Sequence, residues 1–313
     1  MSHANHNHIF LNALPVIAIL GVSTYILLVL RVFSPESLRR APQRPNQVSL
    51  LELVAALFMV IAAPIACVTF TRNTDILNSS VDVAVALFIM FAVSQRFSDG
   101  SRGLGITGPG KWRALGFGLL LYIGVMPWLI IAELVSAFAQ KIFIHEKTHT
   151  HPVLKQLEHT RSPEQIFWLV IMICVIAPIG EELFFRGLLQ TMLIRLIARW
   201  RRGDSKAAGV TVGERWAGII MAAAIFASVH LMVTKDVWSW LPPLFLLGVT
   251  LGYAYERTGK LWADIPIHAL FNAFAVSLVI LGHVGQRPVV RAPLHGVPTV
   301  HKIHVVQIMF STP

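Results

Sequence analysis

Charged residues are scarce in this chain. Asp, Glu, Lys and Arg make up 13% of its 313 residues, whereas soluble domains carry about 25%. Hydrophobic residues make up 55%. A chain with so little charge cannot cover a large water-facing surface with solvated side chains, so its composition excludes an ordinary soluble enzyme and indicates a membrane protein.

Cysteine is also rare, and the first hydrophobic stretch lacks the pattern of a cleaved signal peptide. The two cysteines, Cys67 and Cys174, both lie in hydrophobic stretches, so neither a disulfide framework nor a cysteine metal site is expected. No Lys or Arg precedes the first hydrophobic stretch, and no small-residue cleavage pattern follows it. We therefore expect that stretch to be a membrane span and not a cleaved signal peptide.

The hydrophobic residues are grouped in blocks of about twenty, a length that crosses a hydrocarbon core of roughly 30 Å as a helix. A helix is expected because backbone amides in lipid must find their hydrogen bonds inside the segment. The sequence therefore predicts an all-α integral membrane protein with about eight transmembrane helices, at residues 9–30, 50–70, 76–94, 114–139, 166–186, 217–234, 237–255 and 264–282.

The distribution of Lys and Arg predicts the orientation. If the amino terminus lies outside, most of these residues fall in inner loops, including the basic stretch from Arg195 to Lys206. The bias favours both termini outside. The net charge of +10 is then explained by topology and by attraction to anionic lipid, so the bilayer is an expected partner and nucleic acid is not.

Several features of the first half do not support a function. Gly105, Gly110 and Lys111 match the start of a phosphate loop, but Trp112 follows where Ser or Thr is needed and no strand precedes the loop. Glu133 is expected near a membrane interface. The histidines at the amino terminus and in the outer loop around residues 145–159 form tracts that bind metal adventitiously, and no dedicated site is expected there.

Two adjacent carboxylates near the end of the fifth block are costly in so apolar a stretch. Glu182 and Arg186 are four residues apart on one helical face, so they can form an ion pair. Glu181 is rotated by about 100° from Glu182 and has no partner on this helix. This leaves Glu181 available as a general base. The structural alternative is a cluster of charges that extend from a helix end to the interface.

Two later spans carry further polar groups. His230 lies in the sixth span, and His268 and Asn272 lie four residues apart on one face of the eighth. Each alone could be a structural hydrogen-bonding group. Together with Glu181 they could converge in one cavity, where a Glu and two His are suited to activating water with or without a metal.

These motifs resemble those of the CPBP intramembrane proteases, also called the CAAX prenyl protease 2 (Ras-converting-enzyme-like) or abortive-infection family. The resemblance covers roughly residues 165–282. It rests on three motifs in the family's order and on the approach to the third motif, namely Glu181-Glu182-x-x-x-Arg186, Phe226-x-x-x-His230, residues 248–262 and His268-x-x-x-Asn272.

The resemblance implies a fold of eight helices around a polar cavity open to the cytosol. It also implies that Glu181 and His230 activate the attacking water, while His268 and Asn272 donate to the oxyanion of the tetrahedral intermediate. The depths of Glu181 and His230 agree only if residues 187–218 form a helical hairpin that projects into the cytosol.

The same resemblance implies that Glu182 and Arg186 fix the helix that presents Glu181. Whether a metal takes part stays open, because a zinc ion would use Glu181, His230 and His268 as ligands. The His-Glu-x-x-His helix of many zinc proteases is missing from this chain, and this favours a site without a tightly held metal.

The expected activity is therefore that of a membrane-embedded protease acting on a membrane-anchored protein or peptide, and prenylated CAAX proteins are the family's named substrates. We expect residues 161–285 to form the catalytic core, with motif-free spans over 1–160 and a short basic tail over 286–313. The chain would be a multi-pass protein of the plasma or inner membrane if bacterial. The alternatives are a catalytically silent membrane interaction or immunity protein of the same family, and a transporter. A transporter is disfavoured because no internal repeat is visible.

Overall fold

The computed structural model describes most of the second half of the chain and part of the first. The described residues are 2–32, 34–43, 48–49, 51, 53–54, 88, 92, 95–97, 99–143, 154, 157–158, 160, 162–202, 209–233 and 238–286. The predicted spans at 50–70 and 76–94 therefore lie almost entirely outside the described residues. So do the outer loop with its histidines and the tail after Gln286.

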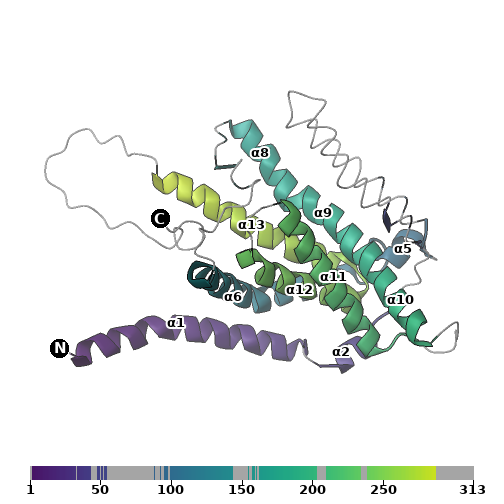
Figure 1. Ribbon diagram of the computed structural model, residues 1–313, viewed down its shortest axis with the longest axis horizontal. Helices are drawn as coiled ribbons and strands as arrows, with labels where there is room; N and C mark the ends of the chain where they lie inside the picture. Colours follow the sequence, from purple (N-terminus) through teal and green to yellow (C-terminus); the bar gives the residue numbers. More distant parts are fainter. Residues whose placement is uncertain are drawn as a thin grey trace.

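The described part of the chain is built from helices (Figure 1). The elements are α1 (Ser2–Val29), α2 (Glu36–Arg39), α5 (Gly100–Leu104), α6 (Lys111–Phe143), α8 (Pro163–Ile171), the π-helix η1 (Met172–Ile176), α9 (Ala177–Glu182), the π-helix η2 (Leu183–Gln190), α10 (Thr191–Arg202), α11 (Val212–Val233), the 3₁₀ turn η3 (Trp238–Trp240), α12 (Leu241–Thr258) and α13 (Leu261–Gln286). Each of the six predicted spans in this part coincides with a helix.

Four helical segments are long and apolar enough to cross a membrane, and the shorter apolar helix Leu14–Val29 accompanies them. They are Lys111–Phe143, Pro163–Arg201, Val212–His230 and Leu261–Gly282. Large apolar side chains such as Val135 and Phe138 on α6 are more than half exposed. An extended apolar surface of this kind is compatible with lipid and not with water. The chain is therefore an all-α integral membrane protein.

The helix predicted over 166–186 is longer than expected. It begins after Ser162, whose hydroxyl accepts a hydrogen bond from the Gln165 amide at 3.4 Å, and it continues without a break through η1, α9 and η2 to Arg202. α11 then folds back beside α10 (Figure 1). The two helical arms of the expected hairpin over 187–218 thus pack side by side, while its projection into the cytosol stays a prediction. Its first turns pack inside the protein, because the side chains from Leu183 to Met192 are buried.

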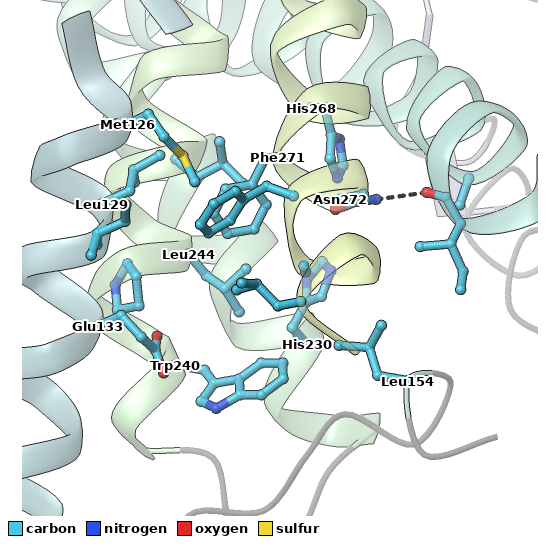
Figure 2. Close-up of a pocket in the computed structure, with 18 of the residues that line it drawn as sticks. Met126, Leu129, Glu133, Leu154, His230, Trp240, Leu244, His268, Phe271 and Asn272 are labelled. Carbon is cyan, nitrogen blue, oxygen red and sulfur yellow. Dashed lines mark hydrogen bonds between the residues drawn. The ribbon is translucent and has the colours of Figure 1, made fainter. Parts of the chain in front are cut away.

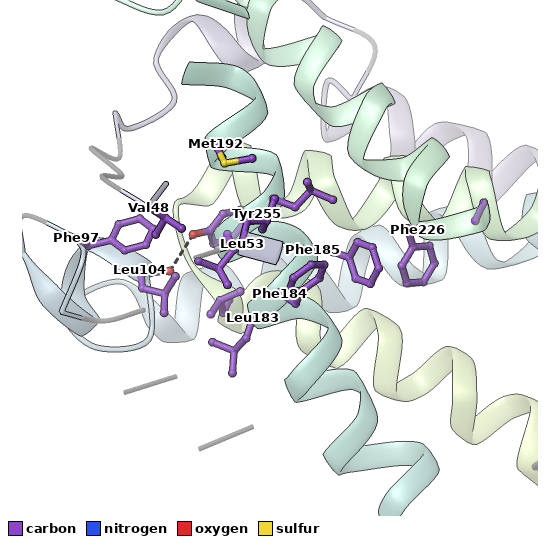
Figure 3. Close-up of a cluster of buried hydrophobic side chains, with 14 of the residues drawn as sticks. Val48, Leu53, Phe97, Leu104, Leu183, Phe184, Phe185, Met192, Phe226 and Tyr255 are labelled. Carbon is purple, nitrogen blue, oxygen red and sulfur yellow. Dashed lines mark hydrogen bonds between the residues drawn. The ribbon is translucent and has the colours of Figure 1, made fainter. Parts of the chain in front are cut away.

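A buried apolar cluster holds the middle of this long helix in place (Figure 3). Phe184 and Phe185 of η2 pack among side chains from α5, α11 and α12. Gly187 faces the side chain of Leu104 so closely that any Cβ there would displace it. The Tyr255 hydroxyl donates to the Leu104 carbonyl at 3.0 Å. These contacts set the position of the segment that carries the paired glutamates.

α12 lies at the centre of the described helices and packs against α6, α11 and α13. α12 overlaps the span predicted over residues 237–255. It is less apolar than the spanning helices, because its buried face carries polar groups. Glu256 forms a buried ion pair with Arg215 of α11, and Gln190 of η2 donates to the Gly252 carbonyl at 3.0 Å. On the other side, Gly118 of α6 lies against the Ala263 carbonyl, where a Cβ would collide.

Candidate active site

Three side chains from three helices meet at one carboxylate oxygen. Oε2 of Glu181, on α9, lies 3.8 Å from Nε2 of His230 on α11 and 3.8 Å from Nε2 of His268 on α13. This oxygen has no hydrogen-bond partner among the described residues. The structure thus brings together the three residues that the sequence placed on separate spans.

The other ring nitrogens define how the two histidines are protonated. Nδ1 of His230 lies 2.8 Å from the Phe226 carbonyl oxygen, and Nδ1 of His268 lies 2.8 Å from Oε1 of Glu182. A carbonyl oxygen and a carboxylate oxygen both only accept hydrogen bonds, so each Nδ1 carries the hydrogen. In a neutral ring, Nε2 then has a lone pair directed towards Glu181.

Glu182 and Arg186 form a buried ion pair behind the site. Arg186 Nε lies 2.9 Å from Glu182 Oε2, and their side chains are 2% and 0% exposed. The guanidinium also stacks over the Phe226 ring, 4.7 Å from its centroid, and donates to the Gly248 carbonyl at 3.4 Å. Two charges taken out of water persist only when they neutralise each other and find further polar partners.

Both π-helical segments flank the site. η1 ends just before α9 and η2 begins just after it, so the turn with Glu181 and Glu182 lies between two widened turns. The Asn272 amide donates to the Ile173 carbonyl of η1 at 2.8 Å (Figure 2). π-Helical turns occur often at functional sites, because they rotate the side chains that follow them.

A cavity of about 400 Å³ opens beside these residues (Figure 2). Glu181, His230, His268 and Asn272 lie on its wall. The rest of the wall is mainly apolar and comes mostly from α6, η1, η3, α12 and α13, with Met126, Leu129, Trp240, Leu244 and Phe271 among the lining residues. Of the six predicted site residues, four therefore line one cavity, and Glu182 and Arg186 lie buried behind it.

Glu133 is an acid in the cavity wall that the sequence did not predict to lie there. Glu133 was expected at a membrane interface, but it lines the cavity with Leu129 and Trp240. α6 continues to Phe143, so Glu133 stands ten residues before the end of its helix. The spacing of acids in one span does not show which side of the helix faces a cavity. The position of Glu133 follows only from the packing of α6 against α12 and α13.

The donor types of this cluster fit a divalent metal, but the spacing is wider than a closed metal site. Two atoms bound tetrahedrally to one zinc at about 2.0–2.1 Å lie roughly 3.3 Å apart, whereas Glu181 Oε2 is 3.8 Å from each Nε2 atom. Within the described residues, no group of three His, Cys, Asp or Glu side chains has the arrangement of a metal site. In favour of a metal, each Nδ1–H donates to an oxygen, as in metal-bound histidines.

The buried pair makes a prediction about stability. Removing either charge alone, in Glu182→Gln or Arg186→Met, should lower the free energy of unfolding by roughly 3–5 kcal/mol, because the remaining charge is buried without compensation. The double variant should lose less than the sum of the two. The measurement is a double-mutant cycle by thermal unfolding in detergent.

The exposed pair of Glu36 and Arg39, 3.0 Å apart, is the matched control. Removing Arg39 should change stability by less than about 1 kcal/mol, as is usual for surface pairs. Strict additivity of the Glu182 and Arg186 effects would contradict the assignment of these two residues as coupled partners.

Comparison with known proteins identifies the part of the chain that forms this site. Residues 163–274 match the family described as type II CAAX prenyl endopeptidase Rce1-like. No curated protein and no solved structure matches the chain. The matched segment runs from the start of α8 into α13 and contains Glu181, His230, His268 and Asn272. Over residues 163–274 the chain is therefore similar to the Rce1-like CAAX protease family.

Proposed function

We propose that this chain is an intramembrane endopeptidase that hydrolyses a peptide bond of a membrane-anchored substrate. The observation that carries the proposal is the convergence of three groups on one point of the cavity wall. The carboxylate oxygen of Glu181 has no hydrogen-bond partner among the described residues, and two imidazole Nε2 atoms face it at 3.8 Å. A water molecule between them can donate one hydrogen to Glu181 and the other to His230.

In the first step Glu181 accepts a proton from this water, and the oxygen adds to the carbonyl carbon of the substrate. The carbonyl oxygen becomes the oxyanion of a tetrahedral intermediate. When the carbon–nitrogen bond breaks, the proton held by Glu181 passes to the leaving amine. The immediate products are a carboxylic acid and an amine, which become a carboxylate and an ammonium ion by transfer of one proton, and Glu181 returns to its ionised form.

His268 and Asn272 are the proposed donors to the oxyanion. Because Nδ1 of His268 donates to Glu182, Nε2 can donate as well only when the ring carries two protons. Asn272 uses one amide hydrogen on the Ile173 carbonyl and has a second for the intermediate. Donors aimed at a developing oxyanion contribute roughly 3–4 kcal/mol each.

The cavity favours an apolar substrate segment that enters from the membrane. Its wall beyond the catalytic cluster is formed mainly by apolar side chains, among them Leu, Met, Phe and Trp. Family members are described as CAAX prenyl endopeptidases, and a prenylated carboxyl-terminal peptide has the apolar character that this wall requires. We therefore take prenylated, membrane-anchored proteins as the proposed substrate class.

We further propose that the site opens to the cytosol. Lys111 and the indoles of Trp112 and Trp262 form one cluster at the amino-terminal ends of α6 and α13. Tryptophan is typical of the membrane interface, and basic residues are enriched on its cytoplasmic side. The basic end of α10 carries Arg199, Arg201 and Arg202, which supports the same orientation.

A labelling experiment tests this orientation. Single cysteines replace Trp200 on α10 and Phe143 at the far end of α6, which are 87% and 81% exposed, in a background without Cys67 and Cys174. The cysteine at position 200 should react only from the cytosolic side and the one at 143 only from outside. Reaction of the position 200 cysteine with an impermeant reagent in intact cells would place the cavity on the opposite face.

The role of Glu181 predicts that Glu181→Gln abolishes cleavage of a prenylated CAAX peptide in proteoliposomes, while the protein still inserts and unfolds at the wild-type temperature. The amide keeps the shape of the side chain and cannot accept the proton. Glu133→Gln is the matched control, because it removes a carboxylate from the same cavity and should retain turnover. Wild-type cleavage by pure Glu181→Gln protein would remove the general base from the mechanism.

Asn272→Ala and the two histidine variants separate the remaining roles. Loss of one oxyanion donor lowers turnover by about 100- to 1000-fold, so Asn272→Ala should lose turnover and leave metal content unchanged.

If a divalent metal is bound, Glu181, His230 and His268 would hold it, and it would supply Lewis acidity to the attacking water. Elemental analysis of wild type, His230→Ala and His268→Ala decides this point. One zinc per chain, lost in both variants, would replace the metal-free mechanism.

A further inference from the structure

Asp264 is a buried acid that the proposed mechanism does not use. It lies in the first turn of α13, one helical turn before His268, and its exposed fraction is 0%. Neither of its carboxyl oxygens has a hydrogen-bond donor among the described residues. Its carboxyl group lies beside the carboxyl group of Glu182. Two carboxyl groups therefore meet in the interior, although the sequence motif contains only one of them.

The charges around Asp264 decide which of the two acids is ionised. The groups facing it are Glu182 and Arg186 from the long helix. Glu182 lies 2.9 Å from the Arg186 guanidinium and 2.8 Å from His268 Nδ1. No cationic group of the described residues lies within 4.0 Å of Asp264, since the ion pairs at that distance do not include it.

Two adjacent buried carboxylates cannot both be ionised, because neither has water to disperse its charge. The proton is retained by the acid that has no cation beside it, which is Asp264. A neutral carboxyl group has one hydrogen to donate. Glu182 Oε1 is occupied by His268, whereas Oε2 lies beside Arg186 but has no well-aligned donor. The geometry leaves Oε2 as the acceptor for the Asp264 hydrogen.

We propose that Asp264 is a neutral positioning residue that donates its carboxyl hydrogen to Glu182. With Arg186 and His268, it gives Glu182 donors from both helices, and Glu182 in turn holds the His268 ring with Nε2 towards Glu181. Its effect on turnover rests on the proposed function above. Its protonation and its effect on stability do not, so failure of one idea can be told from failure of the other.

The first test measures the proton directly. Infrared spectra of wild type and Asp264→Asn in detergent at neutral pH should differ by one carbonyl stretch of a protonated carboxylic acid, which the variant loses. Asp99→Asn, at an exposed position, is the control and should lose only a carboxylate band. If Asp264→Asn also loses only a carboxylate band, Asp264 is ionised and the proposal is wrong.

The second test uses rescue by a side chain that still donates. Asn at position 264 carries an amide hydrogen for Glu182, so Asp264→Asn should unfold at the wild-type temperature. Asp264→Ala leaves Glu182 one donor short and should unfold at a lower temperature. If both variants unfold as the wild type does, or both are equally destabilised, the donor role is refuted.

Turnover supplies the third measurement. A hydrogen bond to a buried charged group stabilises its arrangement by about tenfold or more, so Asp264→Ala should lose about that factor in kcat with KM unchanged. Asp264→Asn should retain wild-type kcat. Wild-type kcat in Asp264→Ala would show that Asp264 does not position His268, even if the infrared band is present. Wild-type protein without any proteolysis would contradict the proposed function and leave the infrared and unfolding results to decide the role of Asp264.

Discussion

The ion pair between Glu182 and Arg186 is the interaction on which the rest of the site depends. Both side chains are removed from water, so the protein has to supply every partner that water would have supplied. It supplies several of them with groups from different helices, namely His268 of α13 and the Gly248 carbonyl of α12. A shift of any one helix would leave a buried charge without compensation. The charge pair therefore converts the loose packing expected of apolar helices into one fixed arrangement.

Phe226 shows how polar and apolar parts of the site are joined. Its ring stacks on the Arg186 guanidinium at 4.7 Å and lies 4.5 Å from the His230 ring and 5.8 Å from the His268 ring, measured between centres. Its carbonyl also holds Nδ1 of His230. One aromatic residue thus contacts the buried cation and both imidazoles, and its carbonyl orients His230. The second motif needs Phe for this contact and not merely an apolar residue.

Much of this arrangement could be predicted from the sequence, because lipid leaves a chain few choices. Blocks of apolar residues had to be helices, and the ordered motifs identified Glu181, Glu182, Arg186, His230, His268 and Asn272 before any geometry was known. The geometry brings all six together, while their catalytic roles stay predictions. A helical hairpin after Arg186 was expected from the depths of Glu181 and His230, whereas the burial of its first turns was not, because hydropathy does not show which turns pack inside the protein. Glu133 was expected at a membrane interface, and Asp264 was not singled out at all. The side of a helix that faces a cavity or a second acid depends on the neighbouring helices, which the sequence does not show.

Because of the two π-helices, the number of residues before Glu181 matters as well as their identity. A π-helical turn holds one residue more than an α-helical turn, and such turns stand on both sides of α9. Deleting one residue from η1 would let the helix return to α geometry and would rotate everything before it by about 100° relative to Glu181. The side chains of the cluster would be unchanged, yet Ile173 would no longer face Asn272. A one-residue gap in this aliphatic stretch is therefore a greater change than the exchange of any single aliphatic side chain within it.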